Sequence, residues 1–274
     1  MERITSRQNA VVKRFRELAR QAGSAHDGGV LLEGEHLLYE ALVCGVPVEV
    51  AAFSDRHVNG SSGSPLAQLA ADVKTRGGRV LSVSDQVLAA ISPVPHPSGV
   101  VAIAQSRPAD LRAAFAPAPA APPLVAILAG LQDPGNVGAI VRTAAAFGAT
   151  GIVTTEGSAD PFGWKALRGA MGGTFRLPVA ARGTLADVTA AARHANVRVI
   201  AAVPRGGTPL PHLDLRQPTA IVLGGEGAGL SEATVRAADQ TVTIPMRAPV
   251  DSLNVAVAAA LMLYEASRQR EDAP

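Results

Sequence analysis

The sequence has little of several residue types, and each shortage excludes a class of protein. Cys44 is the only cysteine among 274 residues, which excludes an intramolecular disulfide and a multi-cysteine zinc site. The longest apolar run, Val255 to Tyr264, is about half of the roughly 20 residues needed to cross a bilayer. The N-terminus is charged and has no apolar stretch typical of a signal peptide. We therefore expect a cytoplasmic protein with no membrane partner.

The absence of several sequence motifs argues against common classes of enzyme. The six histidines show no metal-ligand spacing, so we expect no metal. No GxxxxGK[ST] or GxSxG segment occurs, which argues against P-loop nucleotide hydrolysis and serine hydrolysis. The glycine-rich segment 224–229 has no GxGxxG register, and it follows the fifth predicted strand of its domain, whereas a dinucleotide fingerprint follows the first. A dinucleotide-dependent oxidoreductase is therefore kept only as an alternative.

The residues that are present indicate a packed globular protein with an uneven charge distribution. Hydrophobic residues make up 47% of the chain and charged residues 18%, and the formal net charge is +2. Residues 1–20 carry six basic side chains against two acidic ones. Such a segment can bind the phosphates of a nucleic acid, although a solvated helix face is the alternative. The candidate phosphate-binding residues here are Arg7, Lys13 and Arg14.

Proline divides the chain into two predicted domains. The segment 107–123 holds five prolines, so we expect an extended linker between domains at 1–106 and 124–274. A loop is expected at 59–65. Apolar runs predict strands that alternate with helix-length segments, so we expect an α/β fold with parallel sheets. The predicted strands are 30–32, 48–53, 80–83, 100–104, 124–129, 151–155, 177–180, 197–203, 219–223 and 241–244.

The sequence also indicates four helix starts and three unusual loops that follow predicted strands. Asp160, Thr184, Ser231 and Ser252 are expected N-caps. Ligands of parallel α/β sheets bind at the carboxyl ends of strands, and the segments 130–138, 224–229 and 244–254 all follow predicted strands. Turn formation alone does not require the polar side chains that these loops and the adjoining helix carry, which are Asn136, Arg142, Glu226, Ser252 and Asn254.

Three motifs in order resemble a known enzyme family. NVGAIVRTAAAFG (136–148), IVLGGEGAGL (221–230) and SLNVAVAAALMLYE (252–265) are similar to the motifs of SpoU/TrmH-type RNA 2′-O-ribose methyltransferases of the SPOUT superfamily. LRGAMGGTFRLPV (167–179) resembles the family's sequence between the first two motifs. Residues 4–9, 31–42 and 97–102 resemble the ribosomal-protein-like RNA-binding domain that many members carry in front. The resemblance covers nearly the whole chain outside the linker.

The resemblance implies a fold, a cofactor and an assembly. It implies a C-terminal parallel-sheet domain with a deep trefoil knot, a smaller α/β RNA-binding domain at the N-terminus, and a homodimer. The knot crevice would bind S-adenosylmethionine, largely through main-chain groups. Glycines allow close approach of the backbone, and apolar side chains offer surface to adenine. The matching positions are Leu223, Gly224, Gly225, Glu226, Ile244, Met246, Ser252, Leu253 and Asn254.

The resemblance also points to Arg142 as the catalytic residue. A ribose hydroxyl is a poor nucleophile until it loses its proton, yet a guanidinium is protonated at neutral pH. Either an RNA phosphate helps Arg142 to accept the proton, or Arg142 stays charged, clamps the phosphate and stabilises the developing alkoxide. Asn136, Ser252 and Asn254 would position Arg142 and the ribose. Glu226 would orient its own loop or the arginine.

The sequence therefore predicts an S-adenosylmethionine-dependent RNA methyltransferase acting on a ribose 2′-hydroxyl. Ribosomal RNA, 23S in particular, is the first choice of substrate, and transfer RNA is the second. A non-catalytic RNA-binding paralogue is the alternative from a different class. The third motif fits neither that paralogue nor an oxidoreductase.

Overall fold

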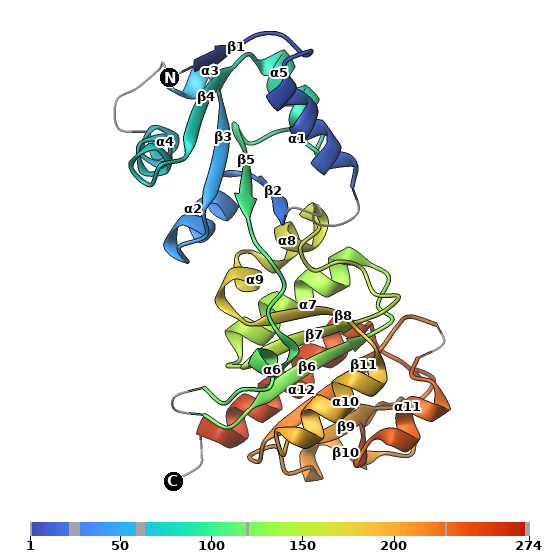
Figure 1. The fold of residues 1–274 in the computed structure, drawn as a ribbon. Helices are drawn as coiled ribbons and strands as arrows, with labels where there is room; N and C mark the ends of the chain where they lie inside the picture. Colours follow the sequence, from blue (N-terminus) through green and yellow to red (C-terminus); the bar gives the residue numbers. More distant parts are fainter. Residues whose placement is uncertain (1, 22–27, 59–63, 119–120, 228, 272–274) are drawn as a thin grey trace. The chain divides into compact units, whose positions relative to one another are not determined.

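The computed structural model divides the chain into two compact units, each with its own sheet and helices (Figure 1). The smaller unit comprises residues 1–107 and 162–175, and the larger one comprises residues 108–161 and 176–274. The structure describes residues 2–21, 28–58, 64–118, 121–227 and 229–271, so most of the loop predicted at 59–65 lies outside the described residues. Both units are α/β, as the sequence predicts.

The smaller unit is built on a five-stranded sheet in the order β1-β4-β3-β5-β2. β5 runs antiparallel to both β3 and β2, so the prediction of a purely parallel sheet is wrong here. The segment that leads into β5 contains prolines at 93, 95 and 97, which cannot continue the preceding helix. The strands are β1 (Glu2–Ile4), β2 (Gly29–Glu33), β3 (Val48–Ser54), β4 (Arg79–Val83) and β5 (Val100–Gln105).

Helices pack on both faces of this sheet. Val12, Phe15 and Leu18 form the buried face of α1, and they join residues of α5 and the sheet in one hydrophobic cluster. The spacing of three places these side chains on one side of the helix, opposite Lys13 and Arg20. The helices formed by residues before the linker are α1 (Ala10–Arg20), α2 (Glu35–Val43), α3 (Asp55–Val58), α4 (Pro65–Thr75) and α5 (Asp85–Ile91).

A later segment of the chain completes the smaller unit. α8 (Trp164–Ala170) packs against β2, the edge strand of the sheet, and Trp164 packs against the hydrophobic cluster of α1 and α5. Gly172 lies against Glu40 of α2, where an added Cβ would come within 2.6 Å of the glutamate side chain. Covering an edge strand blocks pairing with other chains. The domain boundaries expected from the linker do not anticipate this insertion.

The larger unit has a seven-stranded sheet in the order β10-β12-β9-β11-β6-β7-β8, and all of its strand pairs are parallel. Its central strands are buried along their length, as expected for a parallel sheet covered on both faces. β6 and β7 have the predicted bounds. The strands are β6 (Leu124–Ala129), β7 (Gly151–Thr155), β8 (Val179–Gly183), β9 (Arg198–Ala202), β10 (Thr208–Pro209), β11 (Thr219–Gly224) and β12 (Gln240–Thr243).

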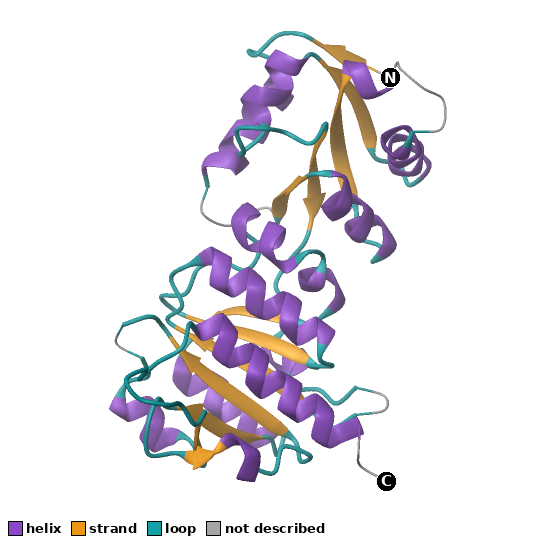
Figure 2. Cartoon of the chain, turned by 180° about the vertical axis from the view of Figure 1, so that it is seen from behind, coloured by secondary structure: helices purple, strands orange, loops and turns teal. Residues whose placement is uncertain are grey.

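Two helical layers cover this sheet. α7 and α12 pack together on one face (Figure 2), and α10 covers the other with the short α6. α6 lies inside the segment predicted as an extended linker, and it buries Ala114 and Phe115 in the core of this unit. The remaining helices are α6 (Leu111–Ala114), α7 (Pro134–Ala146), α9 (Gly173–Arg176), α10 (Leu185–His194), η1 (Leu210–His212), α11 (Glu232–Ala237) and α12 (Val255–Glu271).

Arg270 holds the last turn of α12 in place. Its guanidinium donates to the main-chain carbonyls of Pro122, Pro123, Leu215 and Gln217 at 2.7–3.0 Å. Burial lowers the pKa of the Arg270 guanidinium because the charged group loses hydration. The carbonyls replace that hydration, so the arginine ties the C-terminal helix to the end of the proline-rich segment.

Two of the four predicted N-caps differ from the structure. Thr184 and Ser231 accept main-chain N–H groups of α10 and α11 as predicted. Asp160 does not cap α8, which starts after Gly163, and instead forms an ion pair with Arg182. No helix among the described residues is long and apolar enough to span a membrane.

Candidate active site

A cavity of about 680 Å³ lies at the carboxyl ends of β9, β11 and β12 in the larger unit. These strands end at the same edge because they are parallel, so the loops that follow them converge. Every residue predicted from the sequence to bind the cofactor lines this cavity. These residues are Leu223, Gly224, Gly225, Glu226, Ile244, Met246, Ser252, Leu253 and Asn254.

The first wall is the glycine loop after β11, described here except for residue 228. Gly225 donates its main-chain N–H to the carbonyl of Ala129 at 3.1 Å, which fixes the loop against the end of β6. A Cβ at position 225 would lie 2.5 Å from the carbonyl oxygen of Gly130, closer than real Cβ atoms come. Only glycine therefore fits between the two loops without a shift of the backbone.

The second wall is the segment between β12 and α12. Ile244, Met246 and Leu253 give it apolar character, and Val255, Ala258 and Met262 of α12 extend the apolar lining. The sequence did not mark these helix residues as cavity residues, because a buried helix face explains the same pattern. It also missed Val203 and Pro204 after β9, although the strand-end rule points to them.

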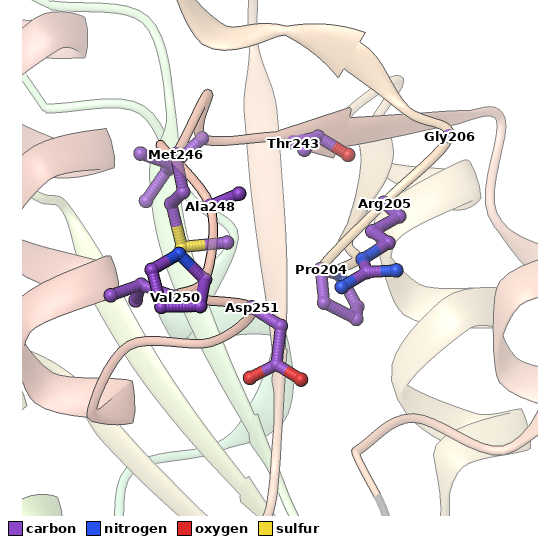
Figure 3. A pocket seen from close by; sticks show the side chains of 10 residues that line it. Pro204, Arg205, Gly206, Thr243, Met246, Ala248, Val250 and Asp251 are labelled. Atoms are coloured by element: carbon purple, nitrogen blue, oxygen red, sulfur yellow. The ribbon is translucent and has the colours of Figure 1, made fainter.

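A smaller pocket of about 500 Å³ adjoins the cavity (Figure 3). The two share Pro204, Ile244 and Met246 as lining residues. Arg205 and Asp251, on separate loops, line only the smaller one (Figure 3). The segment from Ile244 to Asp251 therefore contributes lining residues to both the cavity and the smaller pocket.

Three polar side chains from the three loops form one hydrogen-bonded chain at the cavity rim. Asn254 donates from Nδ2 to Oδ1 of Asn136 at 3.3 Å, and Asn136 donates from Nδ2 to the Glu226 carboxylate. Asn136 is buried, with 9% of its surface exposed. The structure thus brings together three of the five residues predicted to take part in catalysis.

Helix capping fixes which atoms donate and which accept in these hydrogen bonds. The Oδ1 atom of Asn254 accepts the main-chain N–H groups of Ala256 and Val257 at 2.9 and 3.3 Å, so Asn254 is the N-cap of α12. Its Nδ2 atom can then only donate to Asn136, whose own Nδ2 in turn faces Glu226. The prediction that Ser252 caps this helix is wrong. The Ser252 hydroxyl instead makes a 3.4 Å hydrogen bond with Asp251.

Arg142 is not part of this cavity. It is exposed on α7, six residues after Asn136, and it is absent from the lining. Among the described residues, it has no hydrogen-bond or ion-pair partner. Six residues correspond to about 1.7 helical turns, so the Asn136 and Arg142 side chains point to different sides of α7. Within one subunit, the expected contact of Arg142 with Asn136, Ser252 or Asn254 does not occur.

The predicted RNA-binding residues in α1, and Arg7 just before it, differ in their surroundings. Lys13 is exposed and has no ion-pair partner within the described ranges. Arg14 forms an ion pair with Glu49, which neutralises its charge. Arg7 donates to the main-chain carbonyl of Gln86 at 3.4 Å. Across the part of the chain that the structure describes, no group of three or more His, Cys, Asp or Glu side chains could hold a metal ion.

The fold and cavity define a class of protein: a parallel α/β domain with a small-molecule site at its strand ends, joined to a second α/β unit. The SpoU rRNA methylase family model matches residues 123–264, and the MRM3-like substrate-binding domain matches residues 9–102. The chain belongs to the SpoU rRNA methylase family. The cofactor of this family is S-adenosylmethionine, and the oxidoreductase alternative has no support.

Relatives align along almost the whole chain. An uncharacterized tRNA/rRNA methyltransferase of Synechocystis sp. is 36% identical and covers 97% of this chain and 94% of its own length. The 23S rRNA (guanosine(2553)-2′-O)-methyltransferase RlmP of Bacillus subtilis is 29% identical over 96% and 98% of the two chains. The AdoMet-bound rRNA methyltransferase of Sinorhizobium meliloti superposes with a TM-score of 0.84 at 32% identity, covering 97% of each chain. The trefoil knot stays a prediction.

Proposed function

We propose that the protein transfers a methyl group from S-adenosylmethionine to a ribose 2′-hydroxyl of 23S rRNA. The observation that carries this proposal is the convergence of the three motif loops on one cavity, with the Asn254–Asn136–Glu226 chain at its rim. The RNA and the 2′-oxygen follow the activity named for RlmP, which aligns along nearly its full length. Transfer RNA is the second candidate substrate.

The cavity suits S-adenosylmethionine in size and chemistry. Its volume of about 680 Å³ lies within the range of small-molecule sites. Ile244, Met246 and Leu253 offer apolar contact to the adenine, and the glycine loop brings its main chain to the cavity wall without side chains at 224 and 225. The Glu226 carboxylate favours a cofactor that carries positive charge on sulfur. When bound, this cofactor supplies an already activated methyl group.

The task left to the protein is to position the ribose hydroxyl and accommodate its developing negative charge. We assign the second role to Arg142 as a charged clamp on the adjacent phosphate, because its guanidinium is exposed and offers a fork of N–H donors that suits phosphate oxygens. Asn136 and Asn254 are held rigidly by α12 capping, so we assign them to positioning. Proton acceptance by Arg142 with help from phosphate is the alternative mechanism.

We further propose that two copies of the chain form the functional enzyme, because Arg142 does not reach the cavity of its own subunit. Val257, Leu261 and Tyr264 are 49%, 41% and 52% exposed and follow one face of α12. Tyr264 contacts Phe147 at the end of α7, the helix that carries Arg142. A dimer formed through this apolar face buries it and carries Arg142 toward the partner. The opposite side of the helix, with Ala259 and Met262, is buried within the subunit.

Mapping 2′-O-methylation across the ribosomal and transfer RNAs of a deletion strain and its parent tests the proposed function. The expected result is the loss of one site in 23S rRNA, restored by the wild-type gene but not by the Arg142→Ala variant. A lost site in transfer RNA selects the second substrate. Calorimetric titration with S-adenosylmethionine tests the paralogue alternative, which predicts RNA binding without cofactor binding.

A further inference from the structure

The positive charge of the smaller unit is concentrated on two helices that are far apart in sequence. Elsewhere in this unit, three arginines are neutralised by ion pairs, which join Arg3 with Asp55, Arg56 with Asp85, and Arg79 with Glu2. On α1, Arg14 pairs with Glu49. By contrast, the basic side chains of α1 and α8 other than Arg14 have no hydrogen-bond or ion-pair partner within the described ranges. These are Lys13, Arg16, Arg20, Lys165 and Arg168.

The arrangement of α1 places its unpaired charges on one side. Lys13, Arg16 and Arg20 follow the spacing of a helix face, opposite the buried Val12, Phe15 and Leu18. Glu17 is the only acidic side chain on that face. The charges of this helix therefore point away from the core and remain available to a partner.

α8 adds a second basic element to the same unit. Lys165 and Arg168 are exposed one turn apart, and the segment 162–175 has no acidic residue. Trp164 anchors the helix in the hydrophobic cluster to which α1 contributes, and the Lys165 ammonium lies 5.5 Å from the centroid of the Trp164 ring. This cation–π contact orients the lysine without neutralising its charge.

We propose that α8 is part of the RNA-binding surface, with Lys165 and Arg168 binding phosphates together with Lys13, Arg16 and Arg20. This inference rests on the proposed function and names the part of the protein that holds its substrate. The match to the substrate-binding domain ends at residue 102, so α8 lies within the part of the chain matched as methylase. Unpaired cations without nearby carboxylates are complementary to a polyanion, and neutralising phosphates releases counterions.

The three lysines of the chain provide a test that needs no mutation. Lys13 and Lys165 belong to the proposed surface, whereas Lys74 is exposed on α4, a helix outside the α1–α5 cluster. Acylation of the intact protein is followed by mass spectrometry with and without protein-free 23S rRNA. We expect RNA to slow the modification of Lys13 and Lys165 and to leave Lys74 unchanged. Equal protection of all three lysines, or none at Lys165, overturns the proposal.

A salt titration of RNA binding gives a second readout. Each lost phosphate contact lowers the slope of log K against log salt by about 0.7 for single-stranded RNA. We expect that decrease for Lys165→Gln, about 1.4 for the double change with Arg168→Gln, and none for Lys74→Gln. An unchanged slope in the folded double variant overturns the proposal. Methyl transfer by the wild type is measured separately, so a failure of the proposed reaction is distinguished from a failure of this RNA contact.

Discussion

Asn254 and Asn136, 118 residues apart, share a 3.3 Å hydrogen bond whose direction is set by the capping of α12. The start of the C-terminal helix and the start of α7 are thereby linked to the loop of Glu226. A change that disturbs this link is expected to affect both stability and catalysis, whereas a change at Arg142 is expected to affect catalysis alone.

Replacing Asn136 by aspartate introduces a carboxylate next to Glu226. We expect a loss of about 1–3 kcal/mol in the free energy of unfolding at pH 7.5, because one hydrogen bond is lost and two like charges face each other. Thermal unfolding at this pH measures the loss, with Asn196→Asp at an exposed turn as the control. A loss no larger than that of the control contradicts the expected repulsion.

Replacing Gly225 by alanine forces the glycine loop away from Gly130. We expect the dissociation constant for S-adenosylmethionine to rise at least about tenfold, which corresponds to roughly 1.4 kcal/mol. Calorimetry measures the binding. Gly183→Ala is the matched control, because the added Cβ meets only the side chain of Val188 at 3.1 Å. Equal affinities of the two variants would show that the loop does not hold the cofactor.

The Arg142→Ala variant is expected to bind S-adenosylmethionine with an affinity within about twofold of the wild type, yet to transfer no measurable methyl group. The reason is that Arg142 lies outside the cavity lining and has no structural partner among the described residues. Calorimetry and incorporation of labelled methyl into rRNA separate the two effects. Arg236→Ala, at an exposed arginine of α11, is the control. A rate near that of the wild type would remove Arg142 from the mechanism.

Placing a glutamate at position 261 puts a charge in the exposed apolar face of α12. We expect Leu261→Glu to be a folded monomer in light scattering and to lose methyl transfer, because burying an unpaired carboxylate in the interface is costly. Val43→Glu changes an exposed valine on α2 and is expected to leave the dimer intact. A wild-type protein that is monomeric in solution contradicts the proposed assembly.

Arg270→Lys keeps the charge but loses the planar fork that serves four carbonyls. We expect a loss of about 1–3 kcal/mol in stability. For a chain of this size, that loss corresponds to a decrease in melting temperature of roughly 2–10 °C. Differential scanning calorimetry measures it, and Arg216→Lys provides a control at an exposed arginine. If the wild type and Arg270→Lys melt at the same temperature, hydrogen bonds from lysine and water stabilise these carbonyls as well as the guanidinium does.

Local patterns in the sequence predicted six of the seven strands of the larger unit, and missed the two-residue edge strand β10. The run at 124–129 is apolar throughout, and the run at 151–155 ends in two buried threonines. Both strands have the predicted ends because both faces of their sheet are buried. The loops at its strand ends converge because parallel strands end together. The cavity residues could therefore be predicted, although their part in binding the cofactor stays a prediction.

Features that depend on distant partners could not be predicted in this way. The antiparallel direction of β5 is set by its pairing with β2 and β3, not by its own residues. Asn254 and Ser252 are both good caps, and the choice between them follows from the hydrogen bond to Asn136. The ion pair of Arg14 with Glu49 removed a candidate that looked free in the sequence.

The packing of α8 on the edge of the smaller sheet limits how this protein can be rearranged. A fragment that stops at residue 107 lacks the helix that covers β2 and the Trp164 ring that packs against its hydrophobic cluster. An exchange of the smaller unit between relatives therefore has to include both of its stretches, residues 1–107 and 162–175. The two units are encoded in interleaved stretches of the chain, so changes in substrate preference are expected to co-vary with residues inside the segment matched as methylase.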